Sequence, residues 1–267
     1  MPSSHLFFMS YKISVITVVY NAEATLEKTI LSVINQDFDN FEYIIIDGGS
    51  TDCTVDIINK YQDKVSYWIS EPDMGIYDAM NKGSSLSNGK WILFLNSGDQ
   101  LLENVLKQVT KVLNDNFSII YGNIKILHKG DFKIRYPKDI SSLHYTMPFC
   151  HQAVIVKKSL LVKSAFNLHY RLASDFEFFL KNIKENFLYV PLTLVEYDLF
   201  GLSNRMAFDM MKEYFTIIRL YHTRIDTLYY CSRLILLNKT FIFKSVFIKM
   251  LGLKFFIFIN STVFKNH

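Results

Sequence analysis

Polar side chains that suit a cation and its ligand follow an apolar segment in the middle of this 267-residue chain. Residues 91–95 (WILFL) are followed by Asn96, Ser97, Gly98 and Asp99. Asn, Gly and Asp together are typical of a tight turn. Carboxylate, hydroxyl and amide oxygens are equally the ligands that Mg²⁺ and Mn²⁺ prefer. The short stretch alone leaves both interpretations open.

Three earlier apolar segments also end in polar residues: Tyr20-Asn21 follows 13–19, Asp47 to Asp52 (DGGSTD) follows 43–46, and Glu71 to Gly83 follows 65–69. In open parallel sheets, ligands bind beyond the carboxyl ends of the strands, so these carboxylates should converge on one rim. Carboxylates at one edge repel one another unless a cation or hydrogen bonds intervene. A divalent cation that bridges a diphosphate meets this requirement.

The usual glycine-rich phosphate loops are missing from the sequence. No G-x-G-x-x-G follows residues 13–19, and G-x-x-x-x-G-K-[ST] does not occur, so the dinucleotide and P-loop modes of binding are disfavoured. A nucleotide would instead be held by carboxylates that accept from N–H and O–H groups of the base and ribose.

The elements that must position these residues alternate between strands and helices. Strands are predicted at 13–19, 43–46, 65–69, 91–95 and 119–121, and helices at 26–34, 51–61, 76–86 and 101–113. Alternation of this kind predicts an α/β fold with a mostly parallel central sheet flanked by helices. The later pattern predicts a hairpin at 124–136, strands at 152–156, 187–190 and 195–197, a helix at 174–184 and a helical C-terminal extension from about 204.

Charge and hydrophobicity set the last part of the chain apart. Residues 201–267 carry 10 Lys and Arg against 3 Asp and Glu, whereas residues 1–200 carry 19 against 22. This basic segment is also rich in aromatic and aliphatic residues, which indicates an anionic membrane surface in preference to nucleic acid. Lys244, Lys249 and Lys254 would spread around a helix, so packing on the catalytic domain or on a partner chain remains an alternative. Basic residues interrupt every apolar run there, so no membrane-spanning helix is expected.

The cysteines and the N-terminus bear on the compartment. Cys53, Cys150 and Cys231 are far apart, odd in number and without metal-ligand spacing. They indicate a reduced protein without a disulfide framework, and the N-terminus lacks the pattern of a signal peptide. We therefore expect a cytoplasmic protein, peripheral on the inner face of the cell membrane.

Taken together, the motifs resemble glycosyltransferase family 2 over about residues 12–200, in the order VITVVYNAEATLEKTILSVINQ, YIIIDGGSTDCT, EPDMGIYDAMNKG, FLNSGD, HQA and ASDFEFF. The resemblance is to bacterial members that build surface polysaccharides. It implies a GT-A type nucleotide-diphosphate-sugar-binding fold, with a nucleotide-sugar half at 12–121 and an acceptor half at 122–200, before the extension 201–267. It also implies a metal-dependent, hexosyltransferase-like inverting enzyme that uses Mg²⁺ or Mn²⁺, a UDP-sugar and a glycan acceptor, expected to be lipid-linked.

The resemblance further implies a role for each matched residue. The donor-binding residues would be Thr17, Tyr20 and Asn21 in the nucleotide pocket, Asp47 at the base edge, Asp73 beside the nucleoside, Asn81 and Lys82 near the ribose, phosphates or donor sugar, and Asn96, Ser97 and Gly98. Asp99 would bind the metal that bridges the phosphates. Asp175 would be the general base, because a carboxylate within hydrogen-bond reach can take the proton of an acceptor hydroxyl. His151 and Gln152 would lie near the donor diphosphate or the acceptor.

Departures from the family pattern keep other hypotheses open. Many members have Asp-Ser-Asp-Asp where this chain has Asn96-Ser97-Gly98-Asp99, so one carboxylate remains. Mg²⁺ needs only one or two protein carboxylates when phosphates supply further oxygens. A motif with a single carboxylate is also compatible with a catalytically silent nucleotide-sugar-binding or scaffold protein. A nucleotidyltransferase ranks third, because a basic glycine-rich triphosphate loop is missing. Structural roles compete as well, since the Asp47–Asp52 stretch and Asp175 suit helix starts.

Overall fold

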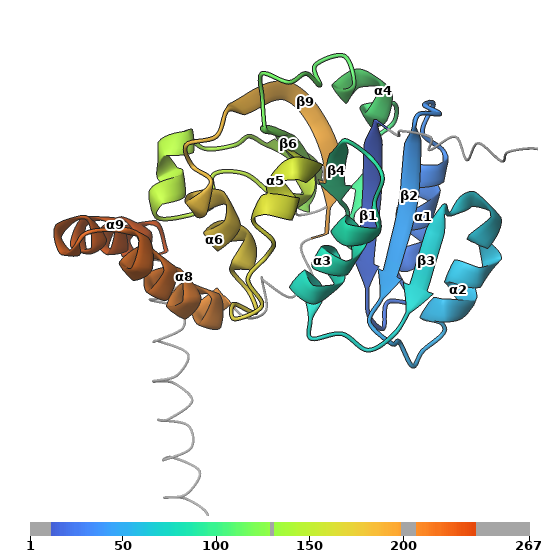
Figure 1. Ribbon diagram of the computed structural model, residues 1–267, viewed down its shortest axis with the longest axis horizontal. Coiled ribbons are helices and arrows are strands. Elements are labelled where there is room, and N and C mark those ends of the chain that lie inside the picture. Colours follow the sequence, from blue (N-terminus) through green and yellow to red (C-terminus); the bar gives the residue numbers. More distant parts are fainter. Residues whose placement is uncertain (1–11, 129–130, 199–206, 239–267) are drawn as a thin grey trace, which may run out of the picture.

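The structure is a computed structural model that describes residues 12–128, 131–198 and 207–238. A mixed nine-stranded sheet runs through the molecule in the order β3-β2-β1-β4-β8-β6-β9-β5, with β7 paired to β6. Figure 1 shows β1 to β3 at one end with helices on both faces of the sheet, and α8 and α9 at the other end. The α/β architecture predicted from the sequence is confirmed.

The first half of the sheet is parallel, as the alternating pattern predicts. Its strands are β1 (Ile13–Val19), β2 (Phe41–Asp47), β3 (Tyr67–Ser70) and β4 (Trp91–Phe94), connected by α1 (Leu26–Ile34), α2 (Thr54–Lys60), the short η1 (Gln62–Lys64) and α3 (Ile76–Leu86). β1 is buried along its whole length between β2 and β4, which explains its unbroken run of apolar and β-branched residues. The pairing aligns Val19 with Asp47, so the carboxyl ends of these strands lie at one edge.

The second half of the sheet mixes both strand directions. It contains β5 (Gln100–Leu101), β6 (Ile119–His128), β7 (Asp131–Arg135), β8 (Val154–Lys157) and β9 (Phe187–Tyr197). β8 runs antiparallel to β4 and β6, whereas β9 runs parallel to β6. Around the strands lie α4 (Val105–Val109), η2 (Ile140–His144), η3 (His151–Ala153), α5 (Lys158–Lys163) and α6 (Ser174–Lys181).

Two predicted elements differ from the structure. The helix predicted at 101–113 is reduced to α4, because Leu101 pairs with Val195 in β5 and Asn104 adopts a left-handed conformation with φ of 58°. The two strands predicted at 187–190 and 195–197 are one strand, β9. Its register against β6 shifts near Gly122, where a Cβ atom would lie 2.6 Å from the carbonyl oxygen of Leu192. Tertiary pairing therefore overrides the local pattern at both places.

The described part of the C-terminal extension is helical, as expected, and its helix α8 packs on α6. It consists of α8 (Ala207–Tyr221) and α9 (Arg224–Leu237). The ring of Tyr214 on α8 stacks on Phe176 of α6 with centroids 4.2 Å apart. The predicted boundary near residue 200 and the Phe- and Lys-rich stretch 239–267 lie outside the described residues. Across the described ranges, no helix combines the length and hydropathy that a bilayer crossing requires.

Candidate active site

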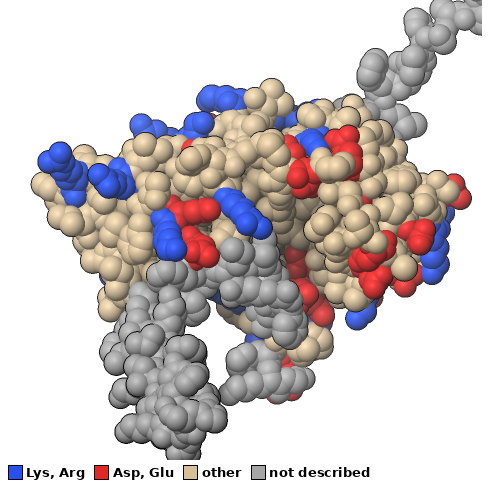
Figure 2. Space-filling view, turned by 90° about the horizontal axis from the view of Figure 1, so that it is seen from below, with Lys and Arg blue, Asp and Glu red and all other residues tan. Residues whose placement is uncertain are grey.

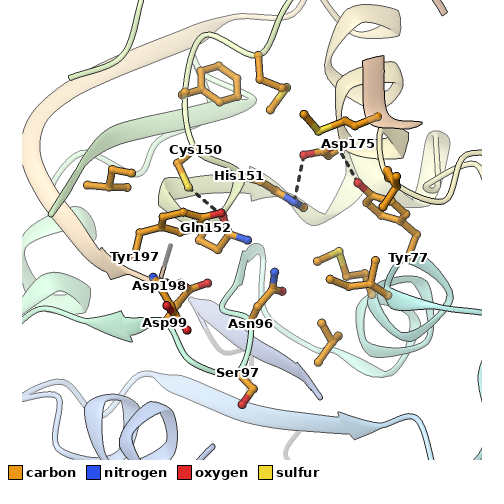
Figure 3. A pocket seen from close by; sticks show the side chains of 18 of the residues that line it. Tyr77, Asn96, Ser97, Asp99, Cys150, His151, Gln152, Asp175, Tyr197 and Asp198 are labelled. Atoms are coloured by element: carbon orange, nitrogen blue, oxygen red, sulfur yellow. Dashed lines mark hydrogen bonds and ion pairs between the residues drawn. The ribbon is translucent and has the colours of Figure 1, made fainter. Parts of the chain in front are cut away.

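A cavity of about 870 Å³ lies between the carboxyl ends of the parallel strands and the second half of the sheet. It brings together these predicted residues: Tyr20, Asp73, Asn96, Ser97, Asp99, His151, Gln152 and Asp175. In the close view of Figure 3, Asp99 and Asp175 lie on either side of this one cavity, with Gln152 and His151 between them. The predicted metal ligand and the predicted base, far apart in the sequence, therefore belong to one site.

Asp47 and Thr17 do not line this cavity. The Asp47 carboxylate is fully buried and accepts hydrogen bonds from the backbone N–H of Ser50 at 2.9 Å and the hydroxyl of Ser70 at 2.6 Å. The hydroxyl of Thr17 lies 3.0 Å from that of Tyr43 in the core. Both side chains have partners within the protein, and their contacts with the donor stay predictions.

Asn81, Lys82, Asn21 and Gly98 are also absent from the cavity wall. The amide of Asn81 donates to the carbonyl of Phe166 at 2.9 Å and accepts from its N–H at 3.0 Å. Lys82 pairs with Glu71 at 2.9 Å, and the Asn21 side chain accepts from the N–H of Thr51 at 2.8 Å. Asn81, Lys82 and Asn21 have partners within the protein, and their contacts with the donor stay predictions.

Asp99 lies at the carboxylate-rich end of the cavity, and the structure gives it a neighbour that the sequence analysis missed. Its Oδ1 accepts a hydrogen bond of 2.8 Å from the N–H of Asp198, the residue after β9. Burial raises the pKa of Asp99 to about 8, while this N–H bond opposes the rise and the charge of Asp198 adds to it. A signal for Asp198 was present in the sequence, because it directly follows the strand predicted at 195–197.

Gly98 explains how the two carboxylates can approach each other. Its φ of +101° favours glycine, and a Cβ atom there would lie 3.0 Å from Oδ2 of Asp198. Gly98 was expected to let the backbone approach the phosphates; in the structure, its missing side chain leaves room for the carboxylate of Asp198. Asp198 thus lies beside Asp99, where the sequence has Asn96-Ser97-Gly98-Asp99 in place of Asp-Ser-Asp-Asp.

The side chains at this end fit a hard divalent cation. Asn96 contributes a buried Oδ1 atom that has no hydrogen-bond partner among the described residues. Asp99, Asp198 and Asn96 together offer oxygen atoms only, which is the preference of Mg²⁺ and Mn²⁺. Within residues 12–128, 131–198 and 207–238, no group of three or more His, Cys, Asp or Glu side chains is arranged around a metal position. A cation here would therefore take its remaining ligands from water and from the donor.

Asp175 lies at the opposite end of the cavity, in the first turn of α6. Its Oδ1 accepts from the hydroxyl of Tyr77 at 2.8 Å and from the N–H of Phe176 at 2.9 Å. Its Oδ2 lies 3.9 Å from Nδ1 of His151. Burial lowers the pKa of His151, with the charge of Asp175 opposing, so the imidazole is neutral at neutral pH. The buried Nε2 atom of His151 has no partner among the described residues, which leaves it available to a bound molecule.

The segment before Asp175 is fixed by α8. The carboxylate of Glu213 accepts from the N–H groups of Arg171, Leu172 and Ala173, at 3.0, 2.9 and 2.9 Å. Together with the stacked Tyr214, this places a helix of the C-terminal extension in direct support of the residue predicted to be the base. Glu213 carried no sequence signal, because an exposed-looking Glu in a helix has many ordinary roles.

The remaining wall of the cavity combines cations with apolar side chains. Arg135, Lys138 and Arg171 line it, and none of them forms an ion pair with a described residue. Burial, together with the charge of Arg135, lowers the pKa of Lys138. The apolar members of this wall are Met147, Leu172, Met210, Tyr214 and Leu237. This wall suits a molecule with both an anionic group and an apolar part.

Comparison with known proteins decides the family. Residues 14–179 match the family model described as Glycosyl transferase family 2. The chain belongs to this family. The match covers the parallel half of the sheet, both ends of the cavity and most of α6, so the site described above lies within the family 2 glycosyltransferase domain apart from Asp198 and α8.

Relatives of this family 2 glycosyltransferase act in glycolipid and glycan synthesis. It is 31% identical over 205 residues to a "PGL/p-HBAD biosynthesis glycosyltransferase" of Mycobacterium bovis, covering 73% of this chain and 80% of that protein. It is 30% identical over 169 residues to the "GalNAc(5)-diNAcBac-PP-undecaprenol beta-1,3-glucosyltransferase" of Campylobacter jejuni, covering 58% and 55% of the two chains.

Solved structures share the fold at low sequence identity. The crystal structure of S. aureus TarS 1-349 in complex with UDP-GlcNAc aligns with a TM-score of 0.67 and 18% identity, over 84% of this chain and 71% of that chain. The mannosyltransferase PcManGT from Pyrobaculum calidifontis, in complex with GDP-Man and Mn²⁺, aligns with a TM-score of 0.59 and 14% identity, over 77% and 63% of the chains.

Proposed function

We propose that this protein transfers a sugar from a nucleotide-diphosphate donor to a glycan acceptor, with inversion at the anomeric carbon, in the synthesis of a bacterial surface polysaccharide or glycolipid. The observation that carries the proposal is the shared cavity, with the Asp99–Asp198 carboxylates at one end and Asp175 at the other. The similar structures of TarS and PcManGT with nucleotide sugars support the donor class.

In this proposal Asp99, Asp198 and Asn96 hold Mg²⁺ or Mn²⁺. The bound cation would supply electrostatic stabilisation to the diphosphate leaving group, whose negative charge grows as the glycosidic bond breaks. Tyr20 and Asp73 lie on the cavity wall where the nucleoside is expected, and the UDP-sugar class is favoured. Ser97 also lines the cavity and is proposed to contact the donor.

Asp175 is the proposed general base. Its Oδ2 takes the proton of the acceptor hydroxyl as that oxygen attacks the anomeric carbon. The displacement proceeds in one step and inverts the configuration, so it needs no second carboxylate as a nucleophile. His151 and Gln152 lie between the two ends of the cavity, where the donor sugar and the acceptor hydroxyl must meet.

The acceptor is proposed to be lipid-linked. Support comes from the mixed wall, where Arg135, Lys138 and Arg171 lie near apolar side chains such as Met210 and Leu237. A sugar carried on a lipid phosphate or diphosphate has this combination of charge and apolar surface. The relative from Campylobacter jejuni acts, by its name, on a diphosphate-linked undecaprenol acceptor.

A thermal-shift screen of nucleotide sugars, with and without Mn²⁺, tests the proposed donor and cation. A ligand at 100 times its dissociation constant stabilises the folded state by about 2.7 kcal/mol, because it binds only that state. We expect UDP-sugars to raise the melting temperature in the presence of Mn²⁺ and much less in its absence. No shift with any nucleotide sugar would contradict the proposal, and binding without turnover on acceptor extracts would favour the silent binding protein.

A cytoplasmic location with peripheral contact to the inner membrane face completes the proposal. On α9, Ile225 is 81% exposed and Leu228 is 75% exposed. Arg224 and Arg233 are exposed on the same helix, and Figure 2 shows basic side chains at this end of the molecule. Apolar side chains beside cations are typical of surfaces that bind anionic membranes.

Vesicle sedimentation tests this membrane contact. We expect the protein to sediment with anionic vesicles, and the double variant Ile225→Ser, Leu228→Ser to bind several-fold more weakly, because each buried apolar side chain contributes to insertion. Val162→Ser is the control, since Val162 is 74% exposed on α5, away from α9. Equal sedimentation of the double variant and the wild type would contradict a role of α9 in this contact.

A further inference from the structure

Tyr77 connects the donor side of the site to Asp175. It lies in the first turn of α3, two residues after Gly75 and four after Asp73, and its hydroxyl donates to Oδ1 of Asp175 across 98 residues of sequence. We propose that Tyr77 is a positioning residue that holds Asp175 with Oδ2 directed to the acceptor hydroxyl. This inference rests on the proposed function, because it takes Asp175 as the base.

The two oxygens of Asp175 are in different environments. Oδ1 accepts two hydrogen bonds, from the Tyr77 hydroxyl and the Phe176 N–H. Among the described residues, no hydrogen bond to Oδ2 is found, and Nδ1 of His151 lies 3.9 Å from it. With the carboxylate plane fixed through Oδ1, the lone pairs of Oδ2 are the ones left to receive a proton.

Tyr77 is well suited to a fixed donor role. Its side chain is 7% exposed, and its ring packs on Phe166 with centroids 5.5 Å apart. The same helix fastens Phe166 through both hydrogen bonds of Asn81. Burial raises the pKa of Tyr77 well above its ordinary value, and the negative charge of Asp175 adds to the rise, so the hydroxyl keeps its proton.

Three titratable side chains near Asp175 are shifted towards their neutral forms by burial. Burial raises the pKa of Cys150 to about 12 and raises the pKa of Tyr214, whereas it lowers the pKa of His151. Tyr77 supplies one of the two hydrogen bonds at Oδ1 of Asp175.

Each bond in the step can be assigned. The acceptor O–H bond breaks and its proton goes to Oδ2 of Asp175, while the acceptor oxygen forms a bond to the anomeric carbon. The bond from that carbon to the diphosphate oxygen breaks, and its electron pair leaves with the nucleoside diphosphate. Tyr77 gives up no proton, and its hydrogen bond to Oδ1 persists throughout.

The variant Tyr77→Phe tests the inference, because it keeps the buried ring and removes only the hydroxyl. We expect kcat to fall about 10- to 100-fold through loss of orientation, with KM for the donor little changed. We also expect the acid limb of the kcat/KM profile to move up by about one pH unit, because a hydrogen bond that favours the ionised carboxylate is lost.

A matched control is the contact of Tyr221 on α8 with α6, the helix that carries Asp175. The hydroxyl of Tyr221 donates to the buried carboxylate of Glu177, two residues after Asp175, and Tyr221 does not line the cavity. Tyr221→Phe should lower thermal stability as Tyr77→Phe does, but leave the acid limb in place. An unshifted limb and unchanged kcat in Tyr77→Phe, with Asp175→Asn inactive, would overturn the role of Tyr77 alone. Full transfer by Asp175→Asn would overturn the proposed base and this inference together.

Discussion

Asp175→Asn should lower kcat for sugar transfer about 10²- to 10⁴-fold, the contribution expected of a general base. The amide has the shape of the carboxylate, and its oxygen can still accept from Tyr77 and from the N–H of Phe176. It cannot take a proton from the acceptor hydroxyl. Initial rates with a nucleotide-sugar donor and an acceptor extract measure the loss, and donor-induced thermal stabilisation should persist.

Asp56→Asn is the control for this first prediction. Asp56 lies in the first turn of α2, as Asp175 lies in the first turn of α6, so both changes remove an acidic group near a helix N-terminus. Asp56 is exposed and outside the cavity. Transfer by Asp175→Asn within about twofold of the wild type would rule out Asp175 as the base.

Asp99→Asn should stabilise the ligand-free protein and abolish its response to Mn²⁺. The folded-state pKa of Asp99 is about 8, whereas an unfolded Asp titrates near 3.9, so the folded state binds more protons between these values. The stability of the wild type relative to the variant should therefore fall as pH rises from about 4 to 8, by up to about 1.4 kcal/mol per pH unit. Denaturant unfolding of both proteins across this range measures the difference.

Cation binding should show the opposite dependence on pH. A carboxylate ligand must be ionised, so Mn²⁺ must displace a proton from Asp99, and its apparent affinity should rise towards pH 8. The change in stability on adding Mn²⁺ should be large for the wild type at pH 8, small at pH 6 and absent in Asp99→Asn. Asp63→Asn, an exposed position in η1, serves as the control. Equal stabilisation of Asp99→Asn and the wild type by Mn²⁺ would remove Asp99 from the cation site.

The sequence was sufficient where the signal was local. The apolar run of β1 and the helical spacing in α1 predicted both elements, and the polar residues after the strands predicted that Asp73 and Asp99 share a rim. Asp47 shows the limit of this reasoning, because a carboxylate after a strand can bind a ligand or cap its own loop. Only coordinates show that its carboxylate accepts hydrogen bonds from Ser50 and Ser70, and its contact with the base of the donor stays a prediction.

The rest depended on contacts between remote residues. Asp198 reaches Asp99 across 99 positions, and Tyr77 reaches Asp175 across 98. Neither pairing could be predicted from the sequence, because a single polar contact involves one residue at each of two remote positions and produces no periodic pattern. The short β5 is similar, because its strand conformation comes from pairing with β9 and not from the propensity of residues 100–101.

The support that Glu213 gives to residues 171–173 affects how truncated versions of this enzyme should be interpreted. Removal of everything after residue 200 would eliminate the proposed membrane contact on α9. It would also leave the N–H groups of residues 171–173, close to Asp175, without the Glu213 carboxylate that accepts their hydrogen bonds. The inactivity of such a truncated protein could then be wrongly attributed to loss of membrane attachment, although the site itself had been damaged. A cut after Asn238 preserves α8 and α9, so it separates the influence of the final 29 residues from damage to α6.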